Sequence, residues 1–234
     1  MTSVAELITD FLQYLEIEKG RSQKTIANYD RYLRTFVSET KVQKPQDITI
    51  QKVRSFRLKL NRQENIRGGN LKSNTQNYYL IALRSFLKYL AKEDVASLTP
   101  EKIELSKTQT RQVDFLEGSD LSALLSAPTQ LKKLQEKPNA TQLRDKAVLE
   151  LFFSTGLRVS ELANLKTTQV NLNKDEFTIR GKGGKLRIVF LTEQARHALR
   201  EYINQRDKMS EFLFVSHDRA GKKREDIPLT PRSI

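Results

Sequence analysis

With 234 residues and no cysteine, the chain can form one large or two ordinary domains, but no disulfide, thiol nucleophile or cysteine-ligated zinc site. Charged residues make up 29% of it and hydrophobic residues 38%, which is typical of a globular protein rather than a disordered or membrane one. The formal net charge of +13 favours a polyanionic partner, with nucleic acid first and an acidic membrane surface second. The N-terminus lacks the pattern of a signal peptide, so we expect a cytoplasmic protein.

The first part of the chain shows four helical patterns, which predict a small helical bundle over residues 1–95. Apolar residues recur there at the three- and four-residue spacing of a helix buried on one face. Gly20 is a natural stop for the first helix, and Thr49 can cap the third. The predicted helices cover residues 4–15, 22–37, 49–60 and 73–92.

The second and fourth predicted helices carry basic and hydrogen-bonding side chains opposite their apolar faces. An α-helix fits the major groove of DNA, so these outer faces are candidate DNA contacts. For one helix alone, ordinary solvated charges are the commoner explanation, since charged outer faces are the norm. The candidate contacts are Lys24, Asn28, Arg31, Thr35, Arg84 and Lys88.

A linker is predicted over residues 96–113, where periodicity is lost around Pro100 and a polar run. The second domain is predicted over 114–234. It opens with a short helix that Pro128 closes, and a polar stretch then leads into a longer apolar helix. This longer helix ends at the most informative motif of the chain.

That motif, Ser154-Thr155-Gly156-Leu157-Arg158-Val159-Ser160-Glu161-Leu162, predicts a tight corner between two helices. Gly156 stands where helices commonly end in the left-handed conformation, so the chain turns just before Arg158. Glu161 lies three residues on and can meet the arginine on one face. A braced arginine near the start of a helix suits bidentate phosphate recognition. For an arbitrary Arg-x-x-Glu, a surface ion pair is the commoner explanation.

A β-hairpin is predicted next, because residues 175–180 and 186–191 are rich in β-branched and aromatic types. The turn Gly181-Lys182-Gly183-Gly184-Lys185 joins them and places Lys182 near the tip. In isolation such a turn is more often just flexible and basic. Lys185 and Arg187 are further candidate DNA contacts.

Taken together, the basic helical N-terminal region, Leu143-Arg144-Asp145-Lys146, the Arg158 motif and the Lys182 hairpin resemble the tyrosine recombinase (phage integrase) family, most nearly its Xer-type members. The resemblance spans essentially the entire chain. It implies an α+β, mainly helical fold. A four-helix, SAM-like core-binding domain would occupy residues 1–95, and a mixed α/β catalytic domain with a β-hairpin, lacking its C-terminal part, would occupy 114–234.

The activity that the resemblance implies is site-specific cutting and rejoining of DNA through a 3′-phosphotyrosyl intermediate, with no metal or nucleotide cofactor. Arg158 matches the first catalytic arginine of the family, and Glu161 matches the acidic residue that supports it. Lys182 matches the hairpin lysine that protonates the leaving 5′-oxygen. The implied partners are double-stranded DNA with a roughly palindromic site and a homo- or hetero-tetramer on two sites. The expected location is the nucleoid, with no membrane.

The family also needs a His-x-x-Arg motif and a tyrosine nucleophile after the hairpin. His197, Arg200 and Tyr202 occur there, but the tyrosine falls in the apolar stripe of its helix and the other two point away from it, so we interpret all three as structural. We interpret His217 as structural or solvated. Because residues 229–234 have the signature of a helix start, we expect a truncated chain that binds DNA but does not cleave it.

Two other classes of function remain open. The chain could be an integrase-derived DNA-binding regulator that keeps Arg158 and Lys182 only as phosphate contacts. It could also be an unrelated basic helical protein that binds RNA or a membrane surface. The last class predicts equal affinity for any polyanion, whereas a recombinase prefers one duplex.

Overall fold

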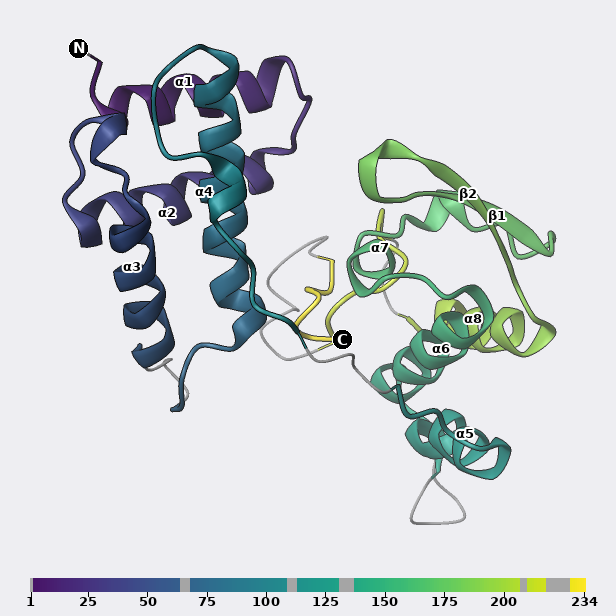
Figure 1. Cartoon of the computed structure of the whole chain (residues 1–234). Helices are drawn as coiled ribbons and strands as arrows, with labels where there is room; N and C mark the ends of the chain where they lie inside the picture. Colours follow the sequence, from purple (N-terminus) through teal and green to yellow (C-terminus); the bar gives the residue numbers. More distant parts are fainter. Residues whose placement is uncertain (1, 64–67, 109–112, 131–136, 207–209, 218–227) are drawn as a thin grey trace. The chain divides into compact units, whose positions relative to one another are not determined.

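In the computed structural model, the chain forms two compact units, Met1–Gln112 and Val113–Ile234 (Figure 1). Each unit has its own hydrophobic core. The structure describes residues 2–63, 68–108, 113–130, 137–206, 210–217 and 228–234, and it does not describe the side chain of Lys182. No helix within these ranges is long and apolar enough to cross a membrane.

The described part of unit 1 contains four α-helices, as the helical periodicity predicts. Three of them begin at capping side chains, because the hydroxyls of Ser3, Ser22 and Thr49 accept hydrogen bonds from backbone N–H groups three residues later. These caps satisfy donors that have no partner within the helix, so local sequence sets the helix boundaries. The elements are α1 (Val4–Ile17), α2 (Gln23–Thr40), η1 (Pro45–Asp47), α3 (Ile50–Arg62), α4 (Ser73–Lys92) and η2 (Pro100–Lys102).

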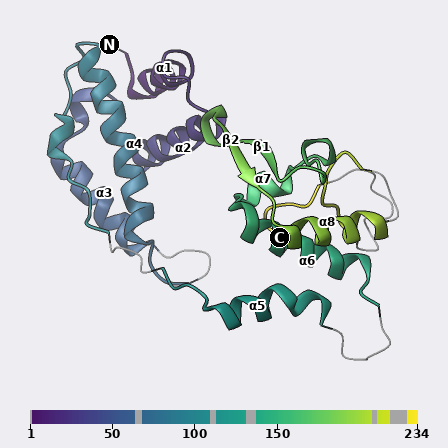
Figure 2. The same ribbon diagram turned by 90° about the vertical axis from the view of Figure 1, so that its right-hand side faces the viewer.

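The core of unit 1 is built around α4, which contacts each of the other three helices (Figure 2). Aromatic rings link neighbouring helices. The ring of Phe86 on α4 lies 5.6 Å from that of Phe11 on α1, and Phe36 on α2 lies 5.2 Å from Phe56 on α3. Such ring pairs stabilise a core beyond the area they bury. The bundle therefore holds the outer faces of α2 and α4 on a packed frame.

The first part of the predicted linker, 96–113, packs onto unit 1. Ile103 is buried in its core, and Arg57 Nη1 donates to the backbone oxygen of Glu104 at 3.1 Å. Asn77 holds both peptide groups of Ser106, accepting from its N–H at 3.0 Å and donating to its oxygen at 2.9 Å. The two units divide after residue 112, at the end of the expected linker. Residues 109–112 lie outside the described part.

In its described residues, unit 2 combines helices with one antiparallel hairpin, which confirms the predicted α+β class. Helices α6 and α8 lie side by side in Figure 1 and Figure 2, and the hairpin contacts α6. The elements are α5 (Gly118–Ser126), η3 (Ala127–Thr129), α6 (Ala140–Thr155), α7 (Val159–Ala163), η4 (Thr167–Gln169), β1 (Glu176–Arg180), η5 (Lys182–Gly184), β2 (Leu186–Phe190) and α8 (Glu193–Gln205).

The hairpin buries one face against the core of unit 2. Phe177, Ile179 and Val189 are buried there, as the two-residue alternation of a strand requires. The outward side chains of β2 are apolar and exposed, namely Leu186, Ile188 and Phe190. Arg187 lies between them in sequence and therefore faces the same side as Val189. This register, rather than the hydrophobic pattern of β2, decides where Arg187 points.

Replacing Asn77 with alanine should destabilise unit 1, because both peptide groups of Ser106 would lose their buried partner. We expect a loss of about 1–3 kcal/mol in the free energy of unfolding, measured by urea denaturation. The matched control is Asn74→Ala, an exposed position on the same helix. Equal effects of the two substitutions would contradict the role of the Asn77–Ser106 pair.

Candidate active site

The corner between α6 and α7 places Arg158 at the start of α7. Gly156 ends α6 with φ 58° and ψ 30°, the predicted left-handed conformation, and its N–H donates to the oxygen of Phe152 at 2.9 Å. The next residue, Leu157, is buried and anchors the turn. Arg158 then adopts an extended backbone as the N-cap of α7, and its side chain is 59% exposed. A buried anchor next to an exposed arginine fixes the point from which the guanidinium reaches out.

Glu161 holds Arg158 at both ends of the residue. One carboxylate oxygen, Oε2, accepts from the backbone N–H of Arg158 at 2.9 Å, and the other, Oε1, accepts from Nη1 of its guanidinium at 2.9 Å. The side chain of Glu161 is only 9% exposed. The predicted Arg-x-x-Glu contact is therefore present, and the side chain of its glutamate is largely shielded from solvent, unlike that of an ordinary surface pair.

A second arginine, Arg187 of β2, also binds Glu161. Its Nη1 donates to Oε1 at 3.0 Å and its Nη2 to Oε2 at 2.7 Å, a bidentate fork. The pKa of Glu161 is lowered from its ordinary 4.5 to about 2, chiefly by the hydrogen bonds from Arg187 and against the opposing effect of burial. The bonds from the backbone and side chain of Arg158 add to this lowering. Glu161 is therefore a carboxylate at any physiological pH.

The hairpin approaches this cluster at Gly181. A Cβ atom built there would lie 3.0 Å from Nη1 of Arg187 and 3.4 Å from Oε1 of Glu161, so a larger side chain would press on the ion pair. Lys182 follows directly, and its backbone begins the turn η5. The fold therefore brings the base of the Lys182 turn beside Glu161, although the lysine side chain itself lies outside the description.

An open cavity of about 560 Å³ adjoins the cluster. Among the described residues, Nε and Nη2 of Arg158 have no hydrogen-bond partner, so two donors remain available to a bound group. A guanidinium with two adjacent donors matches the oxygens of a phosphate. The residues that line the cavity are Arg158, Ser160, Glu161, Asn164, Gln169, Ile179, Arg180 and Gly181.

The remaining predicted DNA contacts lie on surfaces of their own units. In unit 1, Lys24, Arg31 and Lys88 are exposed, whereas Asn28, Thr35 and Arg84 are half-buried. Two of these side chains on α2 have local partners. Arg31 Nη2 donates to Oδ1 of Asn28 at 3.3 Å, and the hydroxyl of Thr35 donates to the oxygen of Arg31 at 2.7 Å. In unit 2, Lys185 is exposed at the end of the turn, and Arg187 is engaged by Glu161.

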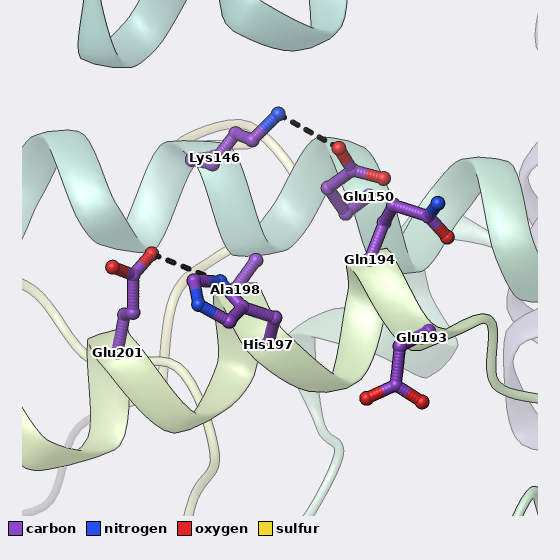
Figure 3. Close-up of a pocket in the computed structure, with 7 residues that line it drawn as sticks. All are labelled: Lys146, Glu150, Glu193, Gln194, His197, Ala198 and Glu201. Atoms are coloured by element: carbon purple, nitrogen blue, oxygen red, sulfur yellow. Dashed lines mark hydrogen bonds and ion pairs between the residues drawn. The ribbon is translucent and has the colours of Figure 1, made fainter.

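The residues interpreted as structural are all outside the Arg158 cavity. His197 lies in a separate cavity of about 370 Å³ between α6 and α8, where its Nδ1 is 3.4 Å from Oε2 of Glu201 (Figure 3). The two cavities share no lining residue. Arg200 donates instead to the oxygen of Leu172 at 2.9 Å. The His-x-x-Arg pattern at 197–200 therefore adds nothing to the cluster.

Tyr202, the one tyrosine of residues 113–234, is 0% exposed. Its hydroxyl accepts from the N–H of Val215 at 3.3 Å and lies 3.2 Å from Nε2 of His217. Burial raises the pKa of this hydroxyl. Tyr202 is therefore a core residue. Its hydroxyl is buried, hydrogen-bonded and harder to ionise than usual, and it cannot reach a phosphate in this structure.

Within the described ranges, no three histidine, aspartate or glutamate side chains gather in a way that could hold a metal ion. The ion-paired groups of the described site are two arginines and one glutamate, and Arg180 also lines the cavity.

The low pKa of Glu161 predicts an acid-labile contribution to stability. The folded state holds the carboxylate more strongly than the unfolded chain, so this contribution is complete above the ordinary pKa and is lost as the pH falls toward about 2. The difference between 4.5 and about 2 sets an upper bound on the order of 3 kcal/mol, which solvent screening around the exposed Arg158 reduces. Urea unfolding of wild type and Glu161→Gln should therefore differ most at neutral pH and converge in acid. The control is Glu176→Gln, which removes an exposed carboxylate on β1. A constant gap between wild type and Glu161→Gln would contradict this account.

The two units match two domains of one protein family. Residues 8–94 match the phage integrase N-terminal SAM-like domain, and residues 115–233 match the phage integrase family. The chain is 35% identical to tyrosine recombinase XerC of Thermodesulfovibrio yellowstonii, covering 87% of this chain and 63% of that protein. It is 33% identical to tyrosine recombinase XerD of Listeria monocytogenes, covering 94% and 74%.

The chain spans 63% and 66% of the lengths of the XerC proteins of T. yellowstonii and Pelobacter propionicus. Solved structures share its fold at lower identity. The Tn1549 transposon integrase in complex with circular intermediate DNA has a TM-score of 0.68 at 16% identity, covering 100% of this chain and 75% of that one. The lambda integrase tetramer bound to a Holliday junction gives 0.67 at 16%, covering 100% and 63%. Given both domain matches and these identities, the chain belongs to the phage integrase family of tyrosine recombinases.

Proposed function

We propose that this chain carries the DNA-binding and phosphate-binding parts of a site-specific recombinase, which cuts and rejoins DNA through a 3′-phosphotyrosyl intermediate. The proposal depends on the geometry of Arg158. Glu161 fixes this arginine through two hydrogen bonds, and two donor atoms of the arginine remain available at the cavity that it lines. Family membership supports the same activity.

In this proposal Arg158 binds the nonbridging oxygens of the scissile phosphate. Phosphoryl transfer builds negative charge on these oxygens, and donors fixed in advance stabilise that charge without reorganising. Glu161 supplies the fixing through its bonds to both ends of Arg158. Lys182 acts as the general acid that protonates the leaving 5′-oxygen. Its position beside Gly181, which contacts the cluster, supports this role.

The tyrosine that attacks the phosphate lies, on our proposal, outside these 234 residues. The burial and hydrogen bonds of Tyr202 support this assignment. The chain alone then binds DNA and does not cleave it. Incubation with a nicked suicide substrate should give no covalent protein–DNA product on a denaturing gel, and covalent capture would contradict the assignment.

The proposed partner is a roughly palindromic DNA duplex, bound by a homo- or hetero-tetramer on two sites. The likeness in fold to a lambda integrase tetramer bound to a Holliday junction supports this assembly. In unit 1, the outer faces of α2 and α4 would enter the major groove. We place the protein on nucleoid DNA in the cytoplasm.

A second candidate function is an integrase-derived regulator that binds DNA without cleavage. The burial of Tyr202 is equally consistent with this regulator and with a recombinase whose attacking tyrosine lies elsewhere. Both functions require the same phosphate contacts. They differ in whether a polypeptide that also contains a downstream His-x-x-Arg and tyrosine forms a covalent DNA intermediate.

Arg158→Ala, in such a polypeptide with the attacking tyrosine, should lower the rate of covalent intermediate formation by about 10²–10³-fold, because one fixed oxyanion donor is lost. Binding to the recombination site should change much less. Single-turnover cleavage and equilibrium binding measure the two effects. The control is Lys174→Ala, which removes an exposed charge away from the cavity. Unaltered cleavage in Arg158→Ala would rule out the proposed role.

Arg31→Ala and Arg84→Ala should each weaken duplex binding and reduce the slope of log affinity against log salt by about one, because each removes a phosphate contact. Fluorescence anisotropy over a salt series measures both quantities. The matched control is Arg54→Ala, an exposed arginine on α3. If all three slopes equal that of wild type, α2 and α4 are not the DNA face.

A further inference from the structure

Arg187 is an arginine on the inward face of a hairpin strand. It stands opposite Ile179 in the register and shares its face with Val189, while the apolar residues on either side of it point outward. Its side chain is 33% exposed, against 59% for Arg158. A partly buried arginine needs a partner that repays the loss of water. The partner that it has is the carboxylate of Glu161.

Arg187 gives Glu161 two hydrogen bonds from the end of its guanidinium. Both of its Nη atoms donate to Glu161, one to each oxygen, so the Nη1–Nη2 end of the guanidinium holds the carboxylate rather than a phosphate. Arg158 differs, since it gives only Nη1 of its guanidinium to the same carboxylate. The two arginines therefore share one acceptor, but Arg187 is bound to it by two side-chain bonds and Arg158 by one, and Arg158 is the more exposed of the two.

Charge balance gives Arg187 a second effect on Arg158. Two arginines and one glutamate carry a net charge of +1 (2 − 1). Without Arg187, Glu161 would neutralise Arg158 within the pair and would compete with a phosphate for its donors. With Arg187 present, the carboxylate is already satisfied, and the positive charge facing the cavity is retained.

The same contact joins two elements that the proposed chemistry must coordinate. Arg187 belongs to β2, whose turn carries Lys182, and Glu161 belongs to α7, which begins at Arg158. The close approach of Gly181 shows how tightly the hairpin is held, because a Cβ there would lie 3.0 Å from Arg187 Nη1. The fork thus ties the base of the Lys182 turn to the helix of Arg158.

We propose that Arg187 is a positioning residue for the phosphate site, acting through Glu161 rather than contacting DNA itself. It orients the carboxylate that orients Arg158, offsets its charge, and sets the hairpin against α7. The effect on DNA binding rests on the proposed function, whereas the positioning of Glu161 rests on the observed hydrogen bonds from Arg187.

The deciding experiment is a double-mutant cycle on duplex binding by the whole chain, measured by fluorescence anisotropy. Arg187→Ala should weaken binding by about tenfold, because Glu161 is then free to neutralise Arg158. In a Glu161→Gln background the same substitution should have little effect, since the competing carboxylate is gone. The control is Lys185→Ala on the same hairpin, whose loss should be equal in both backgrounds. Equal losses for Arg187→Ala in both backgrounds would identify a direct DNA contact and overturn the proposal.

The conservative variant Arg187→Lys provides a second test in case Arg187→Ala does not fold. Lysine keeps the charge but cannot fork onto both oxygens, so it should bind DNA with an affinity between those of wild type and Arg187→Ala. Thermal unfolding identifies any variant that is not folded. An affinity for Arg187→Lys as low as that of a folded Arg187→Ala would show that charge offset plays no part.

A separate measurement distinguishes failure of this inference from failure of the proposed function. NMR titration of the Glu161 carboxyl carbon should show its pKa rising from about 2 toward the ordinary 4.5 in Arg187→Ala. Among the side chains that the structure describes, the charged groups that contact this carboxyl are Arg158 and Arg187. An unchanged pKa overturns the positioning role whatever the DNA result. Absence of duplex binding by wild type overturns the proposed function, and the expected pKa rise would still establish the fork.

Discussion

The hydrogen bonding of the Glu161 carboxylate, on a side chain that is 9% exposed, is the interaction on which the rest of the site depends. It accepts four hydrogen bonds on two oxygens, from the backbone and guanidinium of Arg158 and from both Nη atoms of Arg187. A buried charge is costly unless its bonding capacity is filled, and here two opposite charges fill it. Removing either arginine would leave the carboxylate with fewer hydrogen bonds. Because Glu161 belongs to α7 and Arg187 to β2, these bonds hold the helix and the strand in one arrangement.

Two glycines allow these elements to meet, for different reasons. Gly156 takes a left-handed conformation that lets α6 end and the chain turn immediately into Arg158. Gly181 has an ordinary backbone conformation, but the space where its side chain would stand is taken by the guanidinium of Arg187 and the carboxylate of Glu161. Gly156 therefore allows the chain to change direction, and Gly181 allows the hairpin to lie close to Arg187 and Glu161.

The helix after the hairpin illustrates how similar residue types can serve only the core. Tyr202 stacks on Phe214 with ring centroids 5.6 Å apart, and its hydroxyl bonds within unit 2. His197 and Arg200 stand on the outer side of the same helix and bond to groups away from the Arg158 cavity. Spacing alone suggests a reactive motif there, but burial and direction exclude it. A nucleophile needs an accessible oxygen, whereas this one lies in a packed interior.

The sequence by itself determined the four helices of unit 1, the corner at Gly156, the hairpin and the pairing of Arg158 with Glu161. These features are local: caps, helical spacing, turn residues and a three-residue separation all act within a few positions of one another. The same motifs were sufficient to identify the family. The structure also agrees with the prediction that Tyr202 is buried, because helical periodicity already placed it on the apolar stripe.

Only the tertiary structure decided where Arg187 points. The sequence of β2 has apolar residues at 186, 188 and 190, and alternation alone would turn these inward and the arginine outward, toward DNA. In the fold they are exposed, because Val189 and the inward residues of β1 fill the core and the partner of Arg187 lies 26 residues earlier on α7. A contact over that distance depends on how the hairpin packs against the helix, and no local pattern records it.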